Sequence, residues 1–367
     1  MLEDSVKVDE KDGYRFFMEK EIHEQSKIAQ NIINERVKDG RVCLDELDED
    51  FFEGIDEIVI CACGTSYHAG LAGSYLFERL ASIRTKVEPA SEYRYKKPFM
   101  NKNSLFIAIS QSGETADTLG ALQVAKDAGL KTLVICNVEN SSMVKLADKA
   151  LLTKAGVERS VASTKVFTTQ VLFLWLIVLY LANLRNTISK EKLDSEIKAL
   201  LKVPNSLNIP ENLQKRIRVL TKHYMHGHGF FFIGRDVFYP LALEGALKLK
   251  EVSYLHAEGY ASGEMRHGPI ALVDERLYTV ALLPKNRLYE ETKANVNEII
   301  SRDGHVFVIS PKEFYLSDDF IQTSEQDHYM NEFFEMLVIL QFFSLEISIR
   351  LGNNIDTPRN LVKSVAD

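Results

Sequence analysis

The sequence predicts an α/β protein with two tandem, doubly wound parallel sheets, preceded by a helical segment and followed by a tail. Short apolar runs alternate with helical patterns, and the runs end in Gly- or Ser-rich turns. The same order of run, turn and helix occurs in both halves of the chain. The length of 367 residues fits about two domains at a prior of ~150 residues each.

The elements of the first half follow directly from these patterns. An amphipathic pattern with isoleucines at helical spacing predicts an N-terminal helix that is part of a linker and not a domain. The predicted elements are a helix over Phe17–Val37, a strand over Glu57–Cys63, a helix over Tyr67–Ser82, a strand over Ser104–Ile109, a helix over Asp117–Gly129 and a strand over Lys131–Cys136.

The second half repeats this order. Its predicted elements are a strand over Gly229–Gly234, a helix from Pro240 to Tyr254, a strand over Leu277–Leu283, a helix over Glu290–Ser301 and a strand over Gly304–Ser310. Two matches between the halves, at offsets of about 170 and about 174 residues, indicate a duplicated domain. We expect a linker and helix over 1–45, a first domain over 46–200, a second over 201–350 and a tail over 351–367, with 186–212 connecting the halves.

Composition excludes several classes of function. The formal net charge is −8 and there is no long Lys/Arg run, so nucleic acid is not an expected partner. Four cysteines without CxxC spacing predict neither a disulfide framework nor a zinc site. The apolar stretch Val171–Leu184 is too short to span a bilayer and predicts a buried helix. The first residues resemble no signal peptide, so we expect a cytoplasmic protein without a membrane partner.

Hydroxyl side chains gather where the strands of the first half end. Ser110-Gln111-Ser112-Gly113-Glu114-Thr115 lies between a predicted strand and helix, and Cys63-Gly64-Thr65-Ser66 ends the neighbouring strand. A helix N-terminus offers unpaired N–H groups and partial positive charge, so these loops predict a phosphate site. An ordinary Ser/Thr helix cap is the alternative. The polar segment Val161-Ala162-Ser163-Thr164-Lys165 begins the apolar helix and could also bind the ligand. The alternative is a helix cap followed by a surface lysine.

The second half carries charges on an otherwise apolar helix. Glu244, Lys248 and Glu251 fall on one face at i, i+4 and i+7. A solvent-exposed salt-bridge stripe is one interpretation. The chemical interpretation is a desolvated lysine that attacks a carbonyl, with a carboxylate one turn away that moves a proton.

The histidines allow further hypotheses. His267 precedes Gly268-Pro269 in a predicted loop and is either a structural histidine or an acid/base. His223, His226 and His228 are close in sequence, but no carboxylate partners are evident, so no metal site is expected there.

Taken together, these motifs resemble the isomerase half of glutamine–fructose-6-phosphate aminotransferases. The resemblance rests on residues 63–66, 110–115, 161–165, 244–251, 267–269 and 358–364, and on the N-terminal segment 17–25, in family order across nearly the whole chain. It implies two SIS (sugar isomerase) domains, each with a flavodoxin-like sheet, a homodimer or higher homo-oligomer, and no cofactor or metal.

The resemblance also implies a role for each matching residue. Ser110, Gln111, Ser112 and Thr115 would hold the sugar phosphate, and Ser66 and Ser163 the sugar hydroxyls, with Thr65, Val161 and Ala162 beside them. Lys248 would attack the C2 carbonyl of open-chain fructose 6-phosphate, and Glu251 would move the proton between C1 and C2. His267, supplied by a neighbouring subunit, would assist ring opening. Glu244 would orient the histidine or lysine, and Lys363 of the tail would close over the sugar.

The chain also departs from the family pattern. Family members begin with a glutaminase domain whose nucleophile is an N-terminal cysteine, whereas residue 2 here is Leu2 and the first cysteine is Cys43. We therefore expect a fragment that converts fructose 6-phosphate to glucose 6-phosphate and forms glucosamine 6-phosphate only from added ammonia. Eukaryotic members are inhibited by UDP-N-acetylglucosamine at this half, which makes that nucleotide sugar a further candidate ligand. A non-catalytic SIS module that only senses sugar phosphates is the alternative function.

Overall fold

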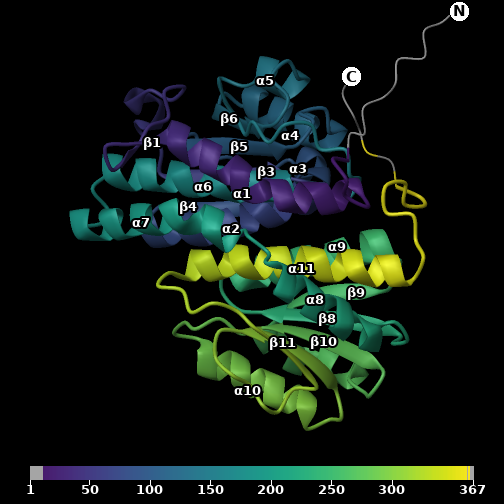
Figure 1. Ribbon diagram of the computed structural model, residues 1–367. Coiled ribbons are helices and arrows are strands. Elements are labelled where there is room, and N and C mark those ends of the chain that lie inside the picture. The colour runs from purple at the N-terminus through teal and green to yellow at the C-terminus, as the bar shows by residue number, and fades with distance from the viewer. Residues whose placement is uncertain (1–10, 362, 364–367) are drawn as a thin grey trace, which may run out of the picture.

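The computed structural model describes residues 11–361 and residue 363. The start of the expected linker (1–10) and most of the end of the expected tail (362 and 364–367) lie outside the described residues. Two parallel five-stranded sheets form the frame of the molecule, and helices lie between them and on their outer faces (Figure 1). The predicted fold class, α/β with two tandem doubly wound parallel sheets, is confirmed.

The two sheets have the same topology. The first has the order β4-β3-β5-β6-β7, formed by β3 (Glu57–Ala62), β4 (Arg84–Pro89), β5 (Ser104–Ser110), β6 (Lys131–Cys136) and β7 (Lys149–Leu152). The second has the order β9-β8-β10-β11-β12, formed by β8 (Gly229–Gly234), β9 (Ala257–Ala261), β10 (Leu277–Leu282), β11 (His305–Ser310) and β12 (Asp319–Gln322). Numbered within each half, both orders are 2-1-3-4-5, the flavodoxin-like order.

Helices cover both faces of both sheets. Those of the first half are α1 (Phe17–Arg36), α2 (Gly64–Leu80), α3 (Ala90–Lys96), α4 (Ala116–Asp127), α5 (Ser142–Leu146) and α6 (Lys165–Leu184). Those that follow are α7 (Lys190–Ser206), α8 (Glu211–Leu220), α9 (Phe238–Ser253), α10 (Tyr289–Ile300) and α11 (Tyr329–Arg350). A short antiparallel pair, β1 (Val37–Lys38) and β2 (Arg41–Val42), follows α1.

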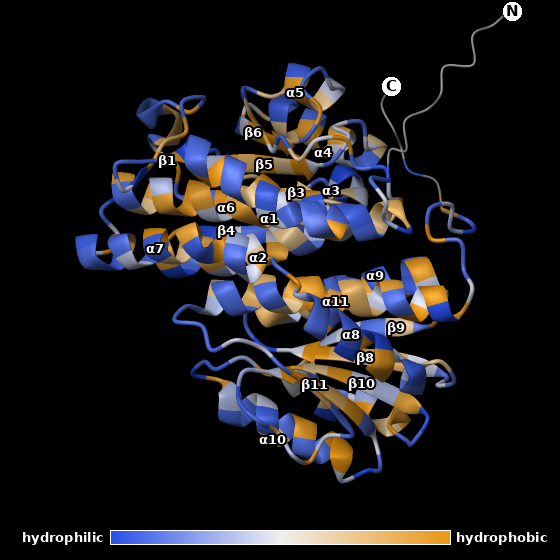
Figure 2. Cartoon of the chain, viewed as in Figure 1, coloured by the Kyte–Doolittle hydropathy of each residue, from blue (hydrophilic) through white to orange (hydrophobic). Residues whose placement is uncertain are grey.

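One large apolar core joins the halves. Alternate strand residues point to opposite faces, so Ile58 and Ile107 pack toward the middle of the molecule, whereas Val59 and Phe106 pack toward α4. The middle core contains residues of α1, α2, α6, α7, α9 and α11 from both halves. Figure 2 shows hydrophobic residues gathered on the strands and on α6 and α11 between the sheets. The halves are therefore packed together through a continuous core.

The apolar helix of the first half is buried, as predicted. The helix α6 is long and apolar enough to cross a membrane by length and composition, but 89% of its apolar window is buried inside the protein. It packs against α1 and α2. The expected connector between the halves contains α7, which packs on α1 and α11.

The edge strands β4, β7, β9 and β12 were not predicted. They are four to six residues long and partly exposed, and they lack the continuous apolar runs of the central strands. Because many of their side chains are only partly buried, these strands lack the continuous apolar sequence that marks a strand buried on both faces.

Candidate functional site

The first sheet places its two hydroxyl-rich loops side by side. The strands β3 and β5 are neighbours, and the chain leaves β3 toward β4 on one side, whereas β5 leads to β6 on the other. This is the switch point of the strand order, where open parallel sheets bind ligands at the carboxyl ends of their strands. The loops after β3 and β5 both open there, at the start of α2 and α4.

A cavity of about 180 Å³ lies between these loops. The lining includes eight of the nine residues expected to contact substrate: Thr65, Ser66, Ser110, Gln111, Ser112, Thr115, Val161 and Ser163. The ninth, Ala162, is buried but does not line the cavity. Cys63, Ile109, Thr118, Glu158 and Lys363 complete the lining.

The serine loop is arranged by its own backbone. The N–H of Gly113 donates to Ser110 Oγ at 3.0 Å, and the N–H of Glu114 donates to Ser112 Oγ at 3.2 Å. Gly113 has φ +67°, and a Cβ there would lie 2.2 Å from the Oγ of Ser141. A side chain at this position would therefore displace the loop from its place beside α5.

The helices that open onto the cavity lack side-chain caps. Neither Cys63 before α2 nor Thr115 before α4 makes a capping hydrogen bond, whereas Ser189 caps α7 by accepting from the N–H of Lys192. The first N–H groups of α2 and α4 thus have no side-chain cap, and the cavity offers hydroxyl and N–H donors in place of a cluster of cations. Capping of α2 by Cys63 or of α4 by Thr115 therefore does not account for the hydroxyl side chains of the two loops.

The charged face of α9 is buried and not exposed to solvent. Only 1% of Lys248 and 1% of Glu244 is exposed. The amine of Lys248 lies 2.5 Å from Glu251 Oε2, 3.1 Å from Thr65 Oγ1 and 3.4 Å from Glu244 Oε1. The interpretation as a solvent-exposed salt-bridge stripe is therefore wrong, since the packing of α9 against α2 and α11 buries this face.

Two residues of α2 bind Glu244 from across the boundary between the halves. Thr65 Oγ1 donates to Glu244 Oε1 at 3.0 Å, and His68 Nδ1 lies 2.7 Å from Glu244 Oε2. His68 was not predicted, and its sequence carries no signal for this contact. Thr65 also lines the cavity, so it joins the hydroxyl loops to the buried charges of α9.

The buried charges shift one another's pKa values. Burial lowers the pKa of Lys248, but the carboxylates of Glu251 and Glu244 raise it more, so the amine is protonated at neutral pH. Burial raises the pKa of Glu251 above its ordinary value, against the opposing effect of Lys248. Burial also acts to raise the pKa of Glu244, but Lys248 and His68 lower it below its usual range. Glu251 is thus the carboxyl of this cluster whose environment favours gaining a proton.

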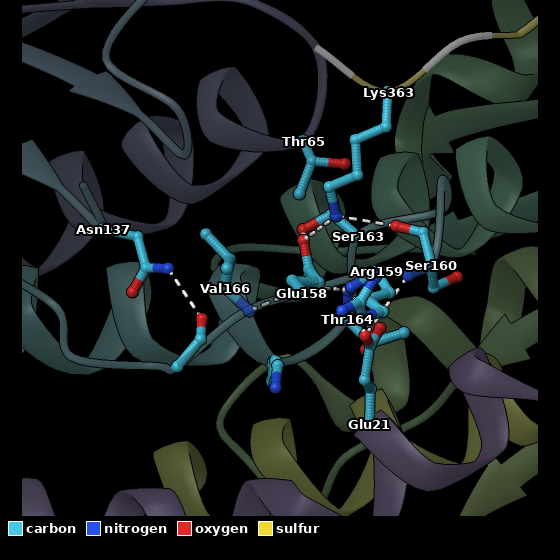
Figure 3. Close-up of polar contacts among 12 residues, drawn as sticks. Glu21, Thr65, Asn137, Glu158, Arg159, Ser160, Ser163, Thr164, Val166 and Lys363 are labelled. Carbon is cyan, nitrogen blue, oxygen red and sulfur yellow. Dashed lines mark hydrogen bonds and ion pairs between the residues drawn. The ribbon is translucent and has the colours of Figure 1, made fainter. Parts of the chain in front are cut away.

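The remaining predicted residues differ in their placement. Lys363 lines the cavity and pairs with Glu158 (Figure 3). His267 ends a short 3-10 helix (Ser262–His267), is exposed and does not line the cavity. Lys165 is buried and pairs with Glu24 at 2.7 Å, so the alternative interpretation of this residue as a surface lysine is wrong.

The histidines before β8 lie away from the cavity. Contrary to expectation, two of them have carboxylate neighbours: His223 lies 3.1 Å from Asp319 and His228 lies 3.7 Å from Asp274. Across the part of the chain that the structure describes, no group of three or more His, Cys, Asp or Glu side chains could hold a metal.

A family model and several sequence relatives match most of this chain. The SIS domain model matches residues 52–180 and 226–325. The glutamine–fructose-6-phosphate aminotransferases of Campylobacter jejuni and Helicobacter pylori are 61% and 53% identical over 355 residues, which are 97% of this chain. The chain spans 59% of the length of each of these two relatives.

A solved structure agrees with the sequence relatives. The C-terminal domain of glucosamine-fructose-6-phosphate aminotransferase from Francisella tularensis superimposes with a TM-score of 0.90 at 38% identity, and the match covers 95% of this chain and 99% of that one.

Proposed function

The chain belongs to the SIS domain family, among the isomerase halves of the glutamine–fructose-6-phosphate aminotransferases, and from this we propose that it binds fructose 6-phosphate and isomerises it to glucose 6-phosphate. One observation carries the proposal. The hydroxyl-lined cavity at the switch point is joined through Thr65 to the buried Lys248–Glu251 pair. A phosphate-binding end thus adjoins groups that can move a proton.

The phosphate is proposed to lie at the serine loop. Ser110, Ser112 and Thr115 would donate their hydroxyls, together with the uncapped N–H groups of α4. Ser66 and Ser163, on the same cavity wall, would contact sugar hydroxyls. The overall charge of −8 gives no general attraction for an anion, so binding depends on these local donors.

Glu251 is the proposed general base. It would take a proton from C1 of the open-chain ketose to give the enediol and return it to C2, while the hydroxyl proton passes from O1 to O2, which yields the aldose with no net change in protons. Burial raises the pKa of Glu251 above the ordinary value, which favours a carboxylate that must accept a proton and then release it. Glu244, held by Thr65 and His68, is proposed to fix the position of Lys248.

In the reaction with added ammonia, an amine of the protein that attacks the C2 carbonyl must first lose its proton. The C2 oxygen then leaves as water, and ammonia displaces the amine from the resulting imine before the C1 proton moves to C2. We propose Lys248 as the attacking amine, since Glu251 lies 2.5 Å away and can accept the proton of the amine. Lys363 is a second amine with access, because it lines the cavity. Borohydride trapping with fructose 6-phosphate, followed by peptide mass mapping, separates the two. A label on Lys248 would support the proposal. A label on Lys363 would refute it and identify the tail lysine as the amine that attacks C2.

A coupled assay for glucose 6-phosphate tests the function. Fructose 6-phosphate should be converted in the presence of a chelator, and added ammonia should give glucosamine 6-phosphate. Calorimetry on the same sample measures binding of fructose 6-phosphate and so tests the alternative, a sensor module without catalytic activity. Binding of fructose 6-phosphate without any turnover would identify a sensor module and refute the isomerase.

A further inference from the structure

The loop between β7 and α6 lies between the N-terminal helix and the C-terminal tail. Residues 153–164 form no regular helix or strand, so side chains from other segments must hold them. In Figure 3, Lys363 approaches this loop from the tail side and Glu21 of α1 approaches from the opposite side. Between them stands Glu158, whose side chain is completely buried.

The carboxylate of Glu158 has two sets of partners. Its Oε1 accepts from the N–H of Thr164 at 2.9 Å and of Val166 at 3.2 Å, and so caps α6 from six residues away. Ser163 Oγ lies 3.3 Å from the same oxygen. Its Oε2 binds the amine of Lys363 at 2.7 Å. One buried carboxylate thus fixes both a serine of the cavity wall and the tail lysine.

The backbone of Ser160 links the two sides of the loop. Its carbonyl accepts from the Lys363 amine at 2.6 Å, and its N–H donates to Glu21 Oε1 at 3.2 Å. The same Glu21 oxygen accepts from the N–H of Arg159 at 2.5 Å. The amine of Lys363 carries three N–H groups, and two have these acceptors, which leaves one for a ligand in the cavity that Lys363 lines.

We propose that Glu158 is a positioning residue that docks Lys363 against the sugar-phosphate cavity, and that Glu21 holds the docking loop from the side of α1. The part concerning the sugar rests on the proposed function. Glu158 itself would repel a phosphate dianion in the same cavity, so its ion pair with Lys363 also neutralises the cavity wall.

The substitution Glu158→Gln tests the negative charge of Glu158 separately from its hydrogen bonds to the start of α6. The amide oxygen still accepts from Thr164 and Val166, whereas the ion pair with Lys363 is lost. Lys363→Met removes the same pair, together with the hydrogen bond to the carbonyl of Ser160, and leaves the Glu158 cap of α6 in place. Glu24→Gln is the matched control, because it removes a carboxylate–lysine pair on α1 that involves Lys165 and not the tail.

Docking of the tail can be measured directly by treating the protein with a carboxypeptidase in the absence of sugar and following the loss of C-terminal residues by mass spectrometry. Relative to a free peptide of the same tail sequence, release of residue 363 should be about tenfold faster in Glu158→Gln and in Lys363→Met than in wild type, equivalent to about 1.4 kcal/mol of lost docking. The double variant should be no faster than either single variant, and Glu24→Gln should behave as wild type. Wild-type trimming rates in Glu158→Gln, or additive effects in the double variant, would overturn the docking pair.

Calorimetry with fructose 6-phosphate tests the consequence for the site. Glu158→Gln should bind about tenfold more weakly, although it removes a negative charge from the cavity wall. Equal or tighter binding would show that Glu158 acts only by repulsion and would overturn the positioning role. Failure of wild type to bind the sugar would instead refute the proposed function, and the trimming rates would still decide the docking pair.

Discussion

Replacing Glu21 with glutamine should remove one pH-dependent component of the stability. Only 2% of Glu21 is exposed, and its Oε2 has no hydrogen-bond partner among the described residues. Burial and the negative charge of Glu158 raise the pKa of Glu21 to about 7, against the opposing charges of Lys165 and Lys363. The folded protein therefore keeps a proton on this carboxyl that the unfolded chain releases near 4.5.

The sign and size of the effect follow from this difference. Between about pH 4.5 and pH 7 the folded state binds more protons than the unfolded state, so stability falls as the pH rises through this window. The shift corresponds to a destabilisation of about 3 kcal/mol once the carboxyl is ionised. Glutamine stays neutral and keeps the acceptor for Arg159 and Ser160, but its unpartnered NH₂ costs about 1 kcal/mol at every pH. As the pH rises from 5 to 8, the free energy of unfolding of Glu21→Gln should increase by about 2.5 kcal/mol relative to that of wild type, because part of the effect is already present at pH 5.

Urea unfolding at pH 5, 6, 7 and 8 measures this difference. Trp175 is the single tryptophan and is fully buried between the sheets, so its fluorescence reports loss of the central core. Ionisable groups distant from Glu21 affect both proteins equally and cancel in the comparison. Glu24→Gln should retain the wild-type pH dependence. Unfolding midpoints of Glu21→Gln that run parallel to those of wild type from pH 5 to pH 8 would refute the assignment of the proton to Glu21.

Three further predictions concern the site. Ser112→Ala and Thr115→Ala should each weaken sugar-phosphate binding by roughly 1.5–3 kcal/mol, because each removes a charge-assisted hydrogen bond; unchanged calorimetric affinity in both would contradict the phosphate assignment. Glu251→Gln should still bind fructose 6-phosphate but lose about 10²-fold or more in turnover, since the amide cannot accept the C1 proton; wild-type turnover would leave the carboxylate only a salt-bridge partner. The protein should be a dimer in sedimentation at micromolar concentration, and mixing inactive His267→Asn with inactive Glu251→Gln should restore activity, because each hybrid keeps one intact site; no recovery after subunit exchange is verified would contradict a shared site.

The central strands and the cavity loops were predictable because their signals are local. A continuous apolar run that ends in Gly64 or Ser110 marks both a buried parallel strand and the turn at its carboxyl end. Because the carboxyl ends of neighbouring parallel strands lie side by side, the two hydroxyl-rich loops are expected to meet. This expectation does not depend on how side chains pack. This explains why nearly all of the predicted substrate contacts line one cavity.

The contacts that escaped prediction depend on distant segments. Glu158 and Glu21 are 137 positions apart, and their buried positions arise from the packing of α1 against α6, for which neither residue carries a sequence signal. Charged residues are rarely buried, so each would be assigned to the surface from sequence alone. His267 is exposed in the single chain, and its predicted role requires a second subunit.

The two copies of the fold contribute different chemistry to one place. The loop after β5 carries hydroxyls, whereas the equivalent loop after β10 begins Leu283-Pro284-Lys285 and has no such cluster. The second copy contributes instead through α9, the equivalent of α2. These two helices pack against each other, and Glu244 of α9 binds Thr65 of α2. The first half thus supplies the proposed phosphate loop, and the second supplies the buried lysine–carboxylate cluster. The continuous core between the sheets sets the distance between them.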